Sequence, residues 1–404
     1  MNQYAFDPFD HKQTQNQWDL LKALRDHAPV SRPIPGFVYV ARHADVAAIF
    51  KDIHENFSSA EGFRGKNVVV PIEESFLGEI DRPLHRELRG LMMQVFKPGL
   101  EKQAEGFARH YISALWQNIK KKGGGDLVAD FGLNIPSAVT SHLLGISADN
   151  IERVGQWGFD LVHSTWPETN ATKDGVGLGG AFPDIATFLD DQIDQRRKET
   201  DASDDMITRM IQAKIEIDGE NSRGLSDLQI RTLCANVLLA SLSTANLIGN
   251  LLLRFVSNTN FENALRADPS LIPGAVEESL RVEPPVLFMM RTAKNDCVIA
   301  DEPIAKGERI LLGIASGNRD ERVFKNADEF QLNRANAKQH LTFAPGIHRC
   351  LGNQLARMEA RVALETAIEI FPPGSMRLHD DFVFEHVPMF LEFGPSHLDA
   401  VFED

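Results

Sequence analysis

The stretch Phe343-Ala-Pro-Gly-Ile-His-Arg-Cys350-Leu-Gly352-Asn-Gln-Leu-Ala-Arg357 decides how the rest of the chain is interpreted. Apolar residues recur at helical spacing after Cys350, which predicts a helix over about residues 351–370 with the cysteine at its N-terminus. Exposed backbone N–H groups and the positive end of the helix dipole favour a thiolate there. A thiolate is what a soft metal site or a nucleophile requires.

Two glycines near this cysteine leave room for a large flat ligand. Gly346 permits a tight turn before the sulfur, and Gly352 removes a side chain that would otherwise strike a planar group. Two other interpretations of a lone cysteine stay open. It can be a buried structural thiol, or a nucleophile, although the general base and oxyanion site that a nucleophile needs are not visible nearby.

Charge and cysteine content narrow the class of protein. The 404 residues carry 42 Lys and Arg against 57 Asp and Glu, a formal charge of −15, which disfavours nucleic acid and anionic membrane surfaces as partners. Three cysteines are too few for a disulfide framework, and the first residues, MNQYAFDPFDHKQ, lack the features of a signal peptide. We therefore expect a cytoplasmic protein.

Periodicity predicts one mainly helical domain with small β-sheets, an α+β protein, over residues 1–404. Helical patterns dominate about residues 82–281 and 351–370, whereas residues 28–60 and 285–312 are β-rich. Residues 232–253 are uncharged but contain several Asn, Ser and Thr side chains, which indicates a buried helix and no membrane span.

The cysteine stretch resembles the haem-binding loop of the cytochrome P450 family, in which Phe343, Gly346, Cys350 and Gly352 have counterparts at the same intervals. Further landmarks follow in the family's order along nearly the whole chain. Glu278-x-x-Arg281 and Arg334 match a buried ion network that holds the cysteine loop. The resemblance implies the cytochrome P450 fold, with haem b between the long distal helix and the cysteine-loop helix and with Cys350 as the iron ligand.

The same resemblance supplies partners for the two haem propionates. His85 and Arg89 stand one helical turn apart, and Arg291 and His348 complete the set. The alternative for these four residues is ordinary surface charge. With Phe343, Cys350 and Gly352 they make up the expected cofactor-binding residues.

The distal helix departs from the family. An ungapped alignment puts Ser243 at the position of the family's threonine and Leu242 at that of its acid, a pair that helps to deliver protons to dioxygen. A shift by one residue would instead put Thr244 at the threonine position, so both hydroxyls are candidate catalytic residues. In either alignment the carboxylate is missing. Water or a substrate hydroxyl replaces it, or the enzyme uses peroxide, or it performs redox-neutral chemistry.

We expect a monomeric monooxygenase that inserts one oxygen atom from O2 into a small lipophilic substrate, of terpenoid, steroid, fatty or aromatic type. Electrons are expected from a separate ferredoxin or flavodoxin and its NAD(P)H-dependent reductase, docking near Arg86 and Arg357. The alternatives are a peroxide-using or redox-neutral haem-thiolate enzyme and, less favoured, a non-catalytic haem sensor. By the same resemblance the substrate pocket is formed by residues 61–76, 159–182, 239–243, 285–290 and 387–390.

Overall fold

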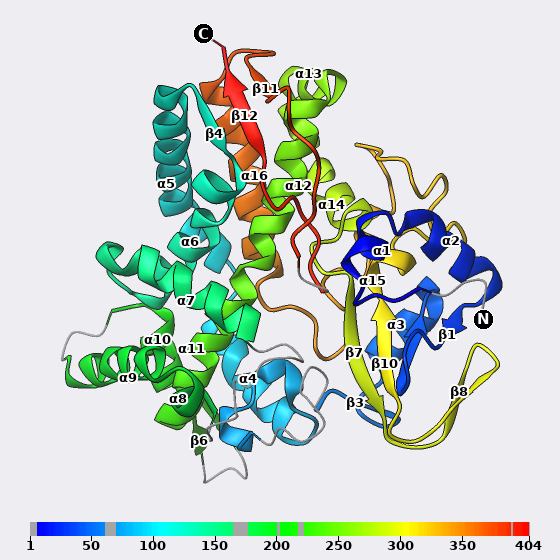
Figure 1. Ribbon diagram of the computed structural model, residues 1–404. Helices are drawn as coiled ribbons and strands as arrows, with labels where there is room; N and C mark the ends of the chain where they lie inside the picture. The colour runs from blue at the N-terminus through cyan, green and yellow to red at the C-terminus, as the bar shows by residue number, and fades with distance from the viewer. Residues whose placement is uncertain are drawn as a thin grey trace. The chain divides into compact units, whose positions relative to one another are not determined.

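The computed structural model describes residues 6–60, 70–164, 177–199, 203–216, 222–388 and 391–403. Helices predominate and the sheets are small (Figure 1), which confirms the predicted fold class. The chain forms two compact units. The first consists of residues 1–58, 108–135 and 243–404, and the second of residues 59–107 and 136–242. The interpretation of residues 1–404 as one domain stays a prediction.

A five-stranded sheet in the order β1-β2-β10-β7-β3 lies in the first unit. Its strands are β1 (Val30–Ser31), β2 (Phe37–Val40), β3 (Phe57–Ser58), β7 (Phe288–Ala293) and β10 (Arg309–Gly313). Strand β10 runs parallel to β2 and antiparallel to β7. The two β-rich portions of the sequence therefore pair with each other, although they are far apart along the chain.

One face of this sheet is buried against helix α3 (His43–Lys51). Val38 and Val40 of β2 and Ile310 and Leu312 of β10 alternate along their strands and belong to the same buried cluster as Phe50 of α3. Alternation with period two is what a strand needs to place its apolar residues on one face. The cluster also contains Leu341, so the sheet supports the start of the cysteine loop.

The helical part of the first unit is built on α12 (Ser243–Ser257), α14 (Ile272–Val282) and α16 (Asn353–Ile370). Helix α16 packs against both α12 and α14. The other elements of this unit are α1 (His11–Gln15), α2 (Trp18–His27), β4 (Gly124–Asp126), η3 (Val128–Gly132), α13 (Thr259–Ala267), η5 (Pro269–Leu271), β8 (Cys297–Ile299), β9 (Glu302–Ile304), α15 (Ile314–Gly317), η6 (Ala337–Gln339), β11 (Met376–Leu378) and β12 (Asp399–Phe402). Helices α5 (Leu100–Lys122) and α6 (Asn134–Leu144) contribute residues to both units.

The second unit is almost entirely helical. Helix α11 (Asp227–Ser241) packs against α7 (Ile151–Ser164) and α9 (Pro183–Lys198), and α10 (Met206–Gln212) packs against α9 and α4 (Leu84–Val95). Shorter elements complete it: η1 (Ile72–Glu74), η2 (Leu77–Glu79), η4 (Ala148–Asn150), α8 (Gly177–Ala181) and the hairpin of β5 (Lys214–Glu216) with β6 (Ser222–Gly224). Ser226 and Gln229 form the capping box that starts α11.

Residues 227–257 are helical except at Leu242, which separates α11 from α12. Among the described helices, this stretch is long and apolar enough to cross a membrane, and 61% of its apolar window is buried inside the protein. A core helix of a globular protein has the same length and composition, and the burial matches the sequence-based expectation of a buried helix.

Candidate functional site

The cysteine loop is a sharp, well-bonded turn that presents the sulfur of Cys350 at the surface of the described residues. The Cys350 backbone N–H donates to the carbonyl oxygen of Phe343 at 3.0 Å. Gly346 has a φ of 102°, and an added Cβ there would collide with the backbone of Phe50, so only glycine fits this turn. Helix α16 begins at Asn353 with Gly352 as its N-cap. It therefore starts two residues later than the sequence suggested, and Cys350 stands two residues before the N-cap.

Among the cysteines, Cys350 is the one that can act as a thiolate ligand. Burial raises the pKa of Cys234 to about 12. Burial also raises the pKa of Cys297, with the nearby charges of Asp296 and Glu308 adding to the effect. Cys350 is exposed, and none of the three forms a disulfide. The structure thus disfavours the interpretation of Cys350 as a buried structural thiol.

The space beside the sulfur fits a flat cofactor. A Cβ added to Gly352 would meet no atom closer than the Cys350 sulfur, at 4.0 Å, so the face of the chain next to the thiol is open. Within the described ranges, no group of three or more His, Cys, Asp or Glu side chains could hold a metal ion by itself. A single thiolate beside an open face is the ligand that the iron of a haem group requires.

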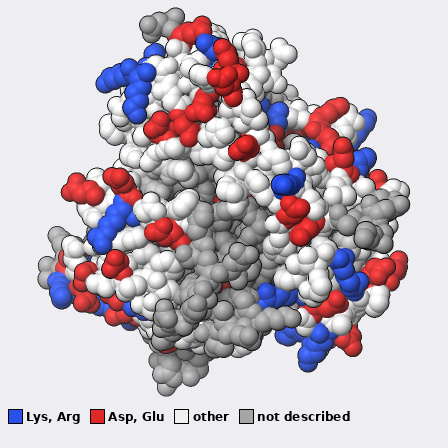
Figure 2. All heavy atoms as spheres, viewed as in Figure 1, with Lys and Arg blue, Asp and Glu red and all other residues white. Residues whose placement is uncertain are grey.

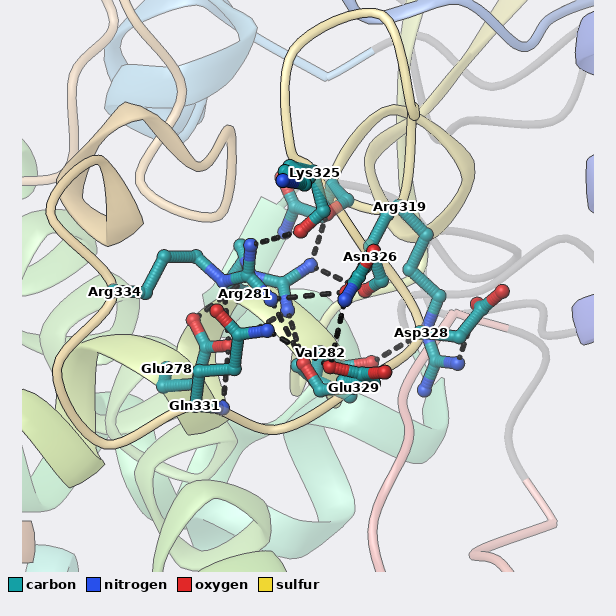
Figure 3. Close-up of polar contacts among 12 residues, drawn as sticks. Glu278, Arg281, Val282, Arg319, Lys325, Asn326, Asp328, Glu329, Gln331 and Arg334 are labelled. Carbon is teal, nitrogen blue, oxygen red and sulfur yellow. Dashed lines mark hydrogen bonds and ion pairs between the residues drawn. The ribbon is translucent and has the colours of Figure 1, made fainter.

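A buried ion network fixes the chain on the way to the cysteine loop (Figure 3). Glu278 of α14 binds Arg281 through both carboxylate oxygens, at 2.7 and 2.8 Å, and Arg334 at 2.7 Å. Arg281 and Arg334 also donate to backbone carbonyls of residues 318–329. Burial raises the pKa of Glu278, but the two arginines outweigh it and lower the pKa. The triad predicted from the sequence is confirmed.

A second ion network, which the sequence analysis missed, holds the loop from the other side. Glu277 of α14 accepts from Arg357 of α16 at 2.5 and 3.1 Å, and from His340 at 3.2 Å. The guanidinium of Arg357 lies 4.4 Å over the ring of Phe343. Arg357 therefore ties the cysteine loop to α14 and keeps 20% of its side chain exposed, and its contact with an electron donor stays a prediction. The doublet Glu277-Glu278 was the one sequence signal for this second network.

The expected propionate partners lie in both units. Arg291 is buried on β7 and donates to the carbonyl oxygen of Met290 at 2.6 Å. His348 lies two residues before Cys350, and its Nε2 is 2.8 Å from Nε2 of His54. In the second unit, His85 is buried and Arg89 half-buried on α4. The roles of all four residues toward haem stay predictions.

The hydroxyl of Ser243, the first residue of α12, has a partner from the far end of the chain. It donates to Oε1 of Glu392 at 3.3 Å, while Nδ2 of Asn246 donates to Oε2 of the same carboxylate at 2.7 Å. Thr244 is buried next to it. The sequence analysis noted the Asn, Ser and Thr side chains of this helix but not their carboxylate partner. The only available signal was an acid inside the apolar run that ends the chain, Leu391-Glu392-Phe393.

Parts of the expected substrate pocket, residues 61–69, 165–176, Met389 and Phe390, lie outside the described residues. The described part of residues 285–290 is apolar and mostly buried, including Leu287, Phe288 and Met290.

Comparisons with known proteins agree with this site. The family model for Cytochrome P450 matches residues 32–377. Cytochrome P450 130 of Mycobacterium tuberculosis is 31% identical over 362 residues, which is 86% of this chain and 86% of the relative. Erythromycin C-12 hydroxylase of Saccharopolyspora erythraea is 30% identical over 355 residues, which is 87% of this chain and 86% of the relative. The solved structure of cytochrome P450 CYP109Q5 from Chondromyces apiculatus superimposes with a TM-score of 0.86 at 27% identity, covering 99% of this chain and 98% of that one.

Fold and cysteine loop together define a haem-thiolate monooxygenase. The chain belongs to the cytochrome P450 family. Members of this family bind haem through a cysteine thiolate, and when bound this group supplies the activation of dioxygen.

Proposed function

We propose that Cys350 ligates haem b and that the enzyme inserts one oxygen atom from O2 into a small lipophilic molecule. The observation that carries this proposal is the exposed thiol of Cys350 beside the open face of Gly352. His85, Arg89, Arg291 and His348 would bind the propionates, and Phe343 and Gly352 would line the cofactor. Ser243, with Thr244 as its neighbour, would serve oxygen chemistry from α12.

A lipophilic substrate is supported by the apolar side chains of residues 285–290. An organic substrate is also supported by the relative named Erythromycin C-12 hydroxylase. Terpenoid, steroid, fatty and aromatic compounds remain the classes to test.

A separate ferredoxin or flavodoxin, with its NAD(P)H-dependent reductase, completes the proposed enzyme, which works as a cytoplasmic monomer. Acidic and basic side chains are interspersed on the face shown in Figure 2, so the net negative charge forms no single large patch among the described residues of that face. A local docking surface is therefore compatible with the overall charge. Arg86, exposed on α4, remains a proposed contact for the donor.

The test is a spectral titration followed by turnover. The ferric protein would be titrated with testosterone, lauric acid, camphor and 4-ethylphenol, because displacement of water from the iron is directly visible. The compound that binds would then be incubated with NAD(P)H, O2, a ferredoxin and its reductase. An oxygenated product whose formation requires NAD(P)H supports the proposal. Product formed with peroxide alone, without NAD(P)H turnover, would support the peroxide-using alternative.

A further inference from the structure

We propose that Glu392 is the acid of the distal site, holding a proton that it passes through the hydroxyl of Ser243 in place of the acid missing at Leu242. This inference rests on the proposed function, since it takes Ser243 to face the reacting oxygen. Glu392 acts through Ser243 and is therefore a positioning and proton-holding residue.

The backbone around Glu392 is fixed on two sides. The carbonyl oxygen of Leu391 accepts from the N–H of Leu287 at 2.7 Å, and the N–H of Phe393 donates to the carbonyl oxygen of Pro285 at 3.0 Å. On the other side, Nδ2 of Asn250 donates to the carbonyl oxygen of Phe393 at 3.1 Å. The acid is thus held in place by bonds that do not involve its own side chain.

The C-terminal segment also lies unusually close to α12. A Cβ added to Gly394 would lie 2.7 Å from Oδ1 and 2.9 Å from Cα of Asn246. One turn further along α12, a Cβ on Gly249 would lie 3.0 Å from Cγ of Pro395. Glycine on each side permits this approach, which brings the carboxylate within hydrogen-bond distance of Ser243 and Asn246.

Glu392, like Glu359 on α16, differs from Glu277 and Glu278 of α14 in that no arginine is among the causes of its pKa shift. Burial raises the pKa of Glu392 to about 7, against the lowering effect of the hydrogen bonds from Asn246 and Ser243. On α12 and at the C-cap of α14, Arg254 and Glu283 pair with each other, and in the C-terminal segment burial lowers the pKa of His386 to about 4. None of these three contributes to the shift. Glu392 can therefore gain and lose a proton near neutral pH.

The hydrogen bonds of Glu392 determine which of its two carboxyl oxygens carries the proton. The amide of Asn246 occupies Oε2 as a donor, so in neutral Glu392 the proton lies on Oε1, which faces the oxygen of Ser243. Oε1–H then donates to Ser243, and Ser243 releases its own hydroxyl proton toward the pocket. Glu392 is left as a carboxylate and recovers a proton from water. In each passage Glu392 takes up one proton from water and Ser243 releases one toward the pocket. The electrons and the oxygen are those of the monooxygenase reaction.

The first test is the pH profile of coupling in the haem-loaded enzyme, with the compound selected from the four-compound panel. We expect product per NAD(P)H in the wild type to fall as pH rises through about 7, since only neutral Glu392 can donate. Glu392→Gln keeps the shape but cannot release a proton. It should show ~10-fold less product per NAD(P)H, more peroxide and no inflection near that pH.

Glu359→Gln is the matched control. Glu359 is a second fully buried glutamate, on α16, and burial raises its pKa to about 8, but it is not among the hydrogen-bond partners of Ser243. We expect Glu359→Gln to retain the wild-type inflection. An unchanged ratio of product to NAD(P)H in Glu392→Gln across this pH range would overturn the inference and leave the proposed function standing.

The second test does not depend on turnover. In the infrared spectrum of the ferric protein, the absorption of protonated carboxyl that titrates near pH 7 should be lost in Glu392→Gln, whereas that of Glu359, whose pKa burial raises to about 8, should remain. Ser243→Ala should move the midpoint to higher pH, because the Ser243 hydrogen bond lowers this pKa. A midpoint that is the same in Ser243→Ala would refute the pairing, even if no panel compound is turned over. Should Glu392→Gln fail to fold, Ser243→Ala decides both tests, since it removes the relay and keeps the acid.

Discussion

Arg357 Nε lies 2.5 Å from Oε1 of Glu277, and this bond ties the cysteine-loop helix α16 to α14. Both side chains are largely buried, with His340 as a further partner of the same carboxylate. Burial raises the pKa of Glu277, but the hydrogen bonds from His340 and Arg357 outweigh it and lower the pKa to about 2. Glu277 therefore ties the start of α16 to α14, and its neighbour Glu278 binds Arg334 in the segment before the cysteine loop.

Arg357→Ala should destabilise the haem-loaded protein by about 3 kcal/mol, because it leaves the carboxylate of Glu277 buried with a hydrogen bond from His340 but no arginine. The measurement is urea unfolding. Arg361→Ala, which removes an i,i+4 pair with Glu365 on the same helix, is the control and should cost less than ~1 kcal/mol. Equal losses in the two variants would contradict the clamp.

The difference in unfolding free energy between the wild type and Arg357→Ala should depend on pH, because the pKa of Glu277 is lowered. A carboxyl with a folded-state pKa of about 2 and an ordinary value of 4.5 contributes stability that is fully present above pH 4.5 and is lost as pH falls toward 2. The gap in unfolding free energy between wild type and Arg357→Ala should therefore shrink over that window. A gap independent of pH would assign the loss to packing alone.

Cys350→His should retain haem but lose the thiolate signature of the reduced, CO-bound protein, because an imidazole replaces the sulfur ligand. The measurement is the position of the Soret band. Cys297→Ser is the control, since the pKa of Cys297 is raised and its thiol is a poor ligand. An unshifted band in Cys350→His would mean that another residue ligates the iron.

Gly394→Ala tests the close approach of the C-terminal segment to α12. The added methyl group would overlap Asn246 and should destabilise the protein by about 1–3 kcal/mol while moving Glu392 away from Ser243. Gly106→Ala is the opposite case. Nothing outside its own helix lies within 4 Å of an added Cβ on Gly106, so alanine should stabilise α5 by up to ~1 kcal/mol. Both values come from thermal or urea unfolding, and a neutral Gly394→Ala would refute the tight contact.

The cysteine loop and the Glu278 network could be predicted from the sequence because their residue types and spacing are local patterns. Cys350, Gly346 and Gly352 lie within seven residues of each other, and Arg281 follows Glu278 by one helical turn. The pairing of the two β-rich portions into one sheet was not predicted, since periodicity identifies strands but not their partners.

Glu392 was missed for a physical reason. It is 149 residues from Ser243, and nothing local to Leu391-Glu392-Phe393 says that the acid is buried. Buried glutamates are rare, so a lone acid in an apolar run suggests a solvent-facing residue. The same limit applies to Arg357 and Glu277, 80 residues apart: the sequence suggested a surface arginine, and only tertiary contacts show the buried pair.

The last prediction combines the two acid positions in one double variant. Leu242 is buried beside Gly158, so Leu242→Asp alone places a carboxyl in an apolar setting and should cost ~1–3 kcal/mol in stability. With Glu392 in place, the new acid is redundant and should not raise product per NAD(P)H. In the Glu392→Gln background, however, Leu242→Asp should restore part of the lost coupling, because it supplies a proton donor next to Ser243. The measurement is product and peroxide per NAD(P)H in the wild type, Leu242→Asp, Glu392→Gln and the double variant. A double variant no better than Glu392→Gln would mean that the missing acid was not what Glu392 replaced.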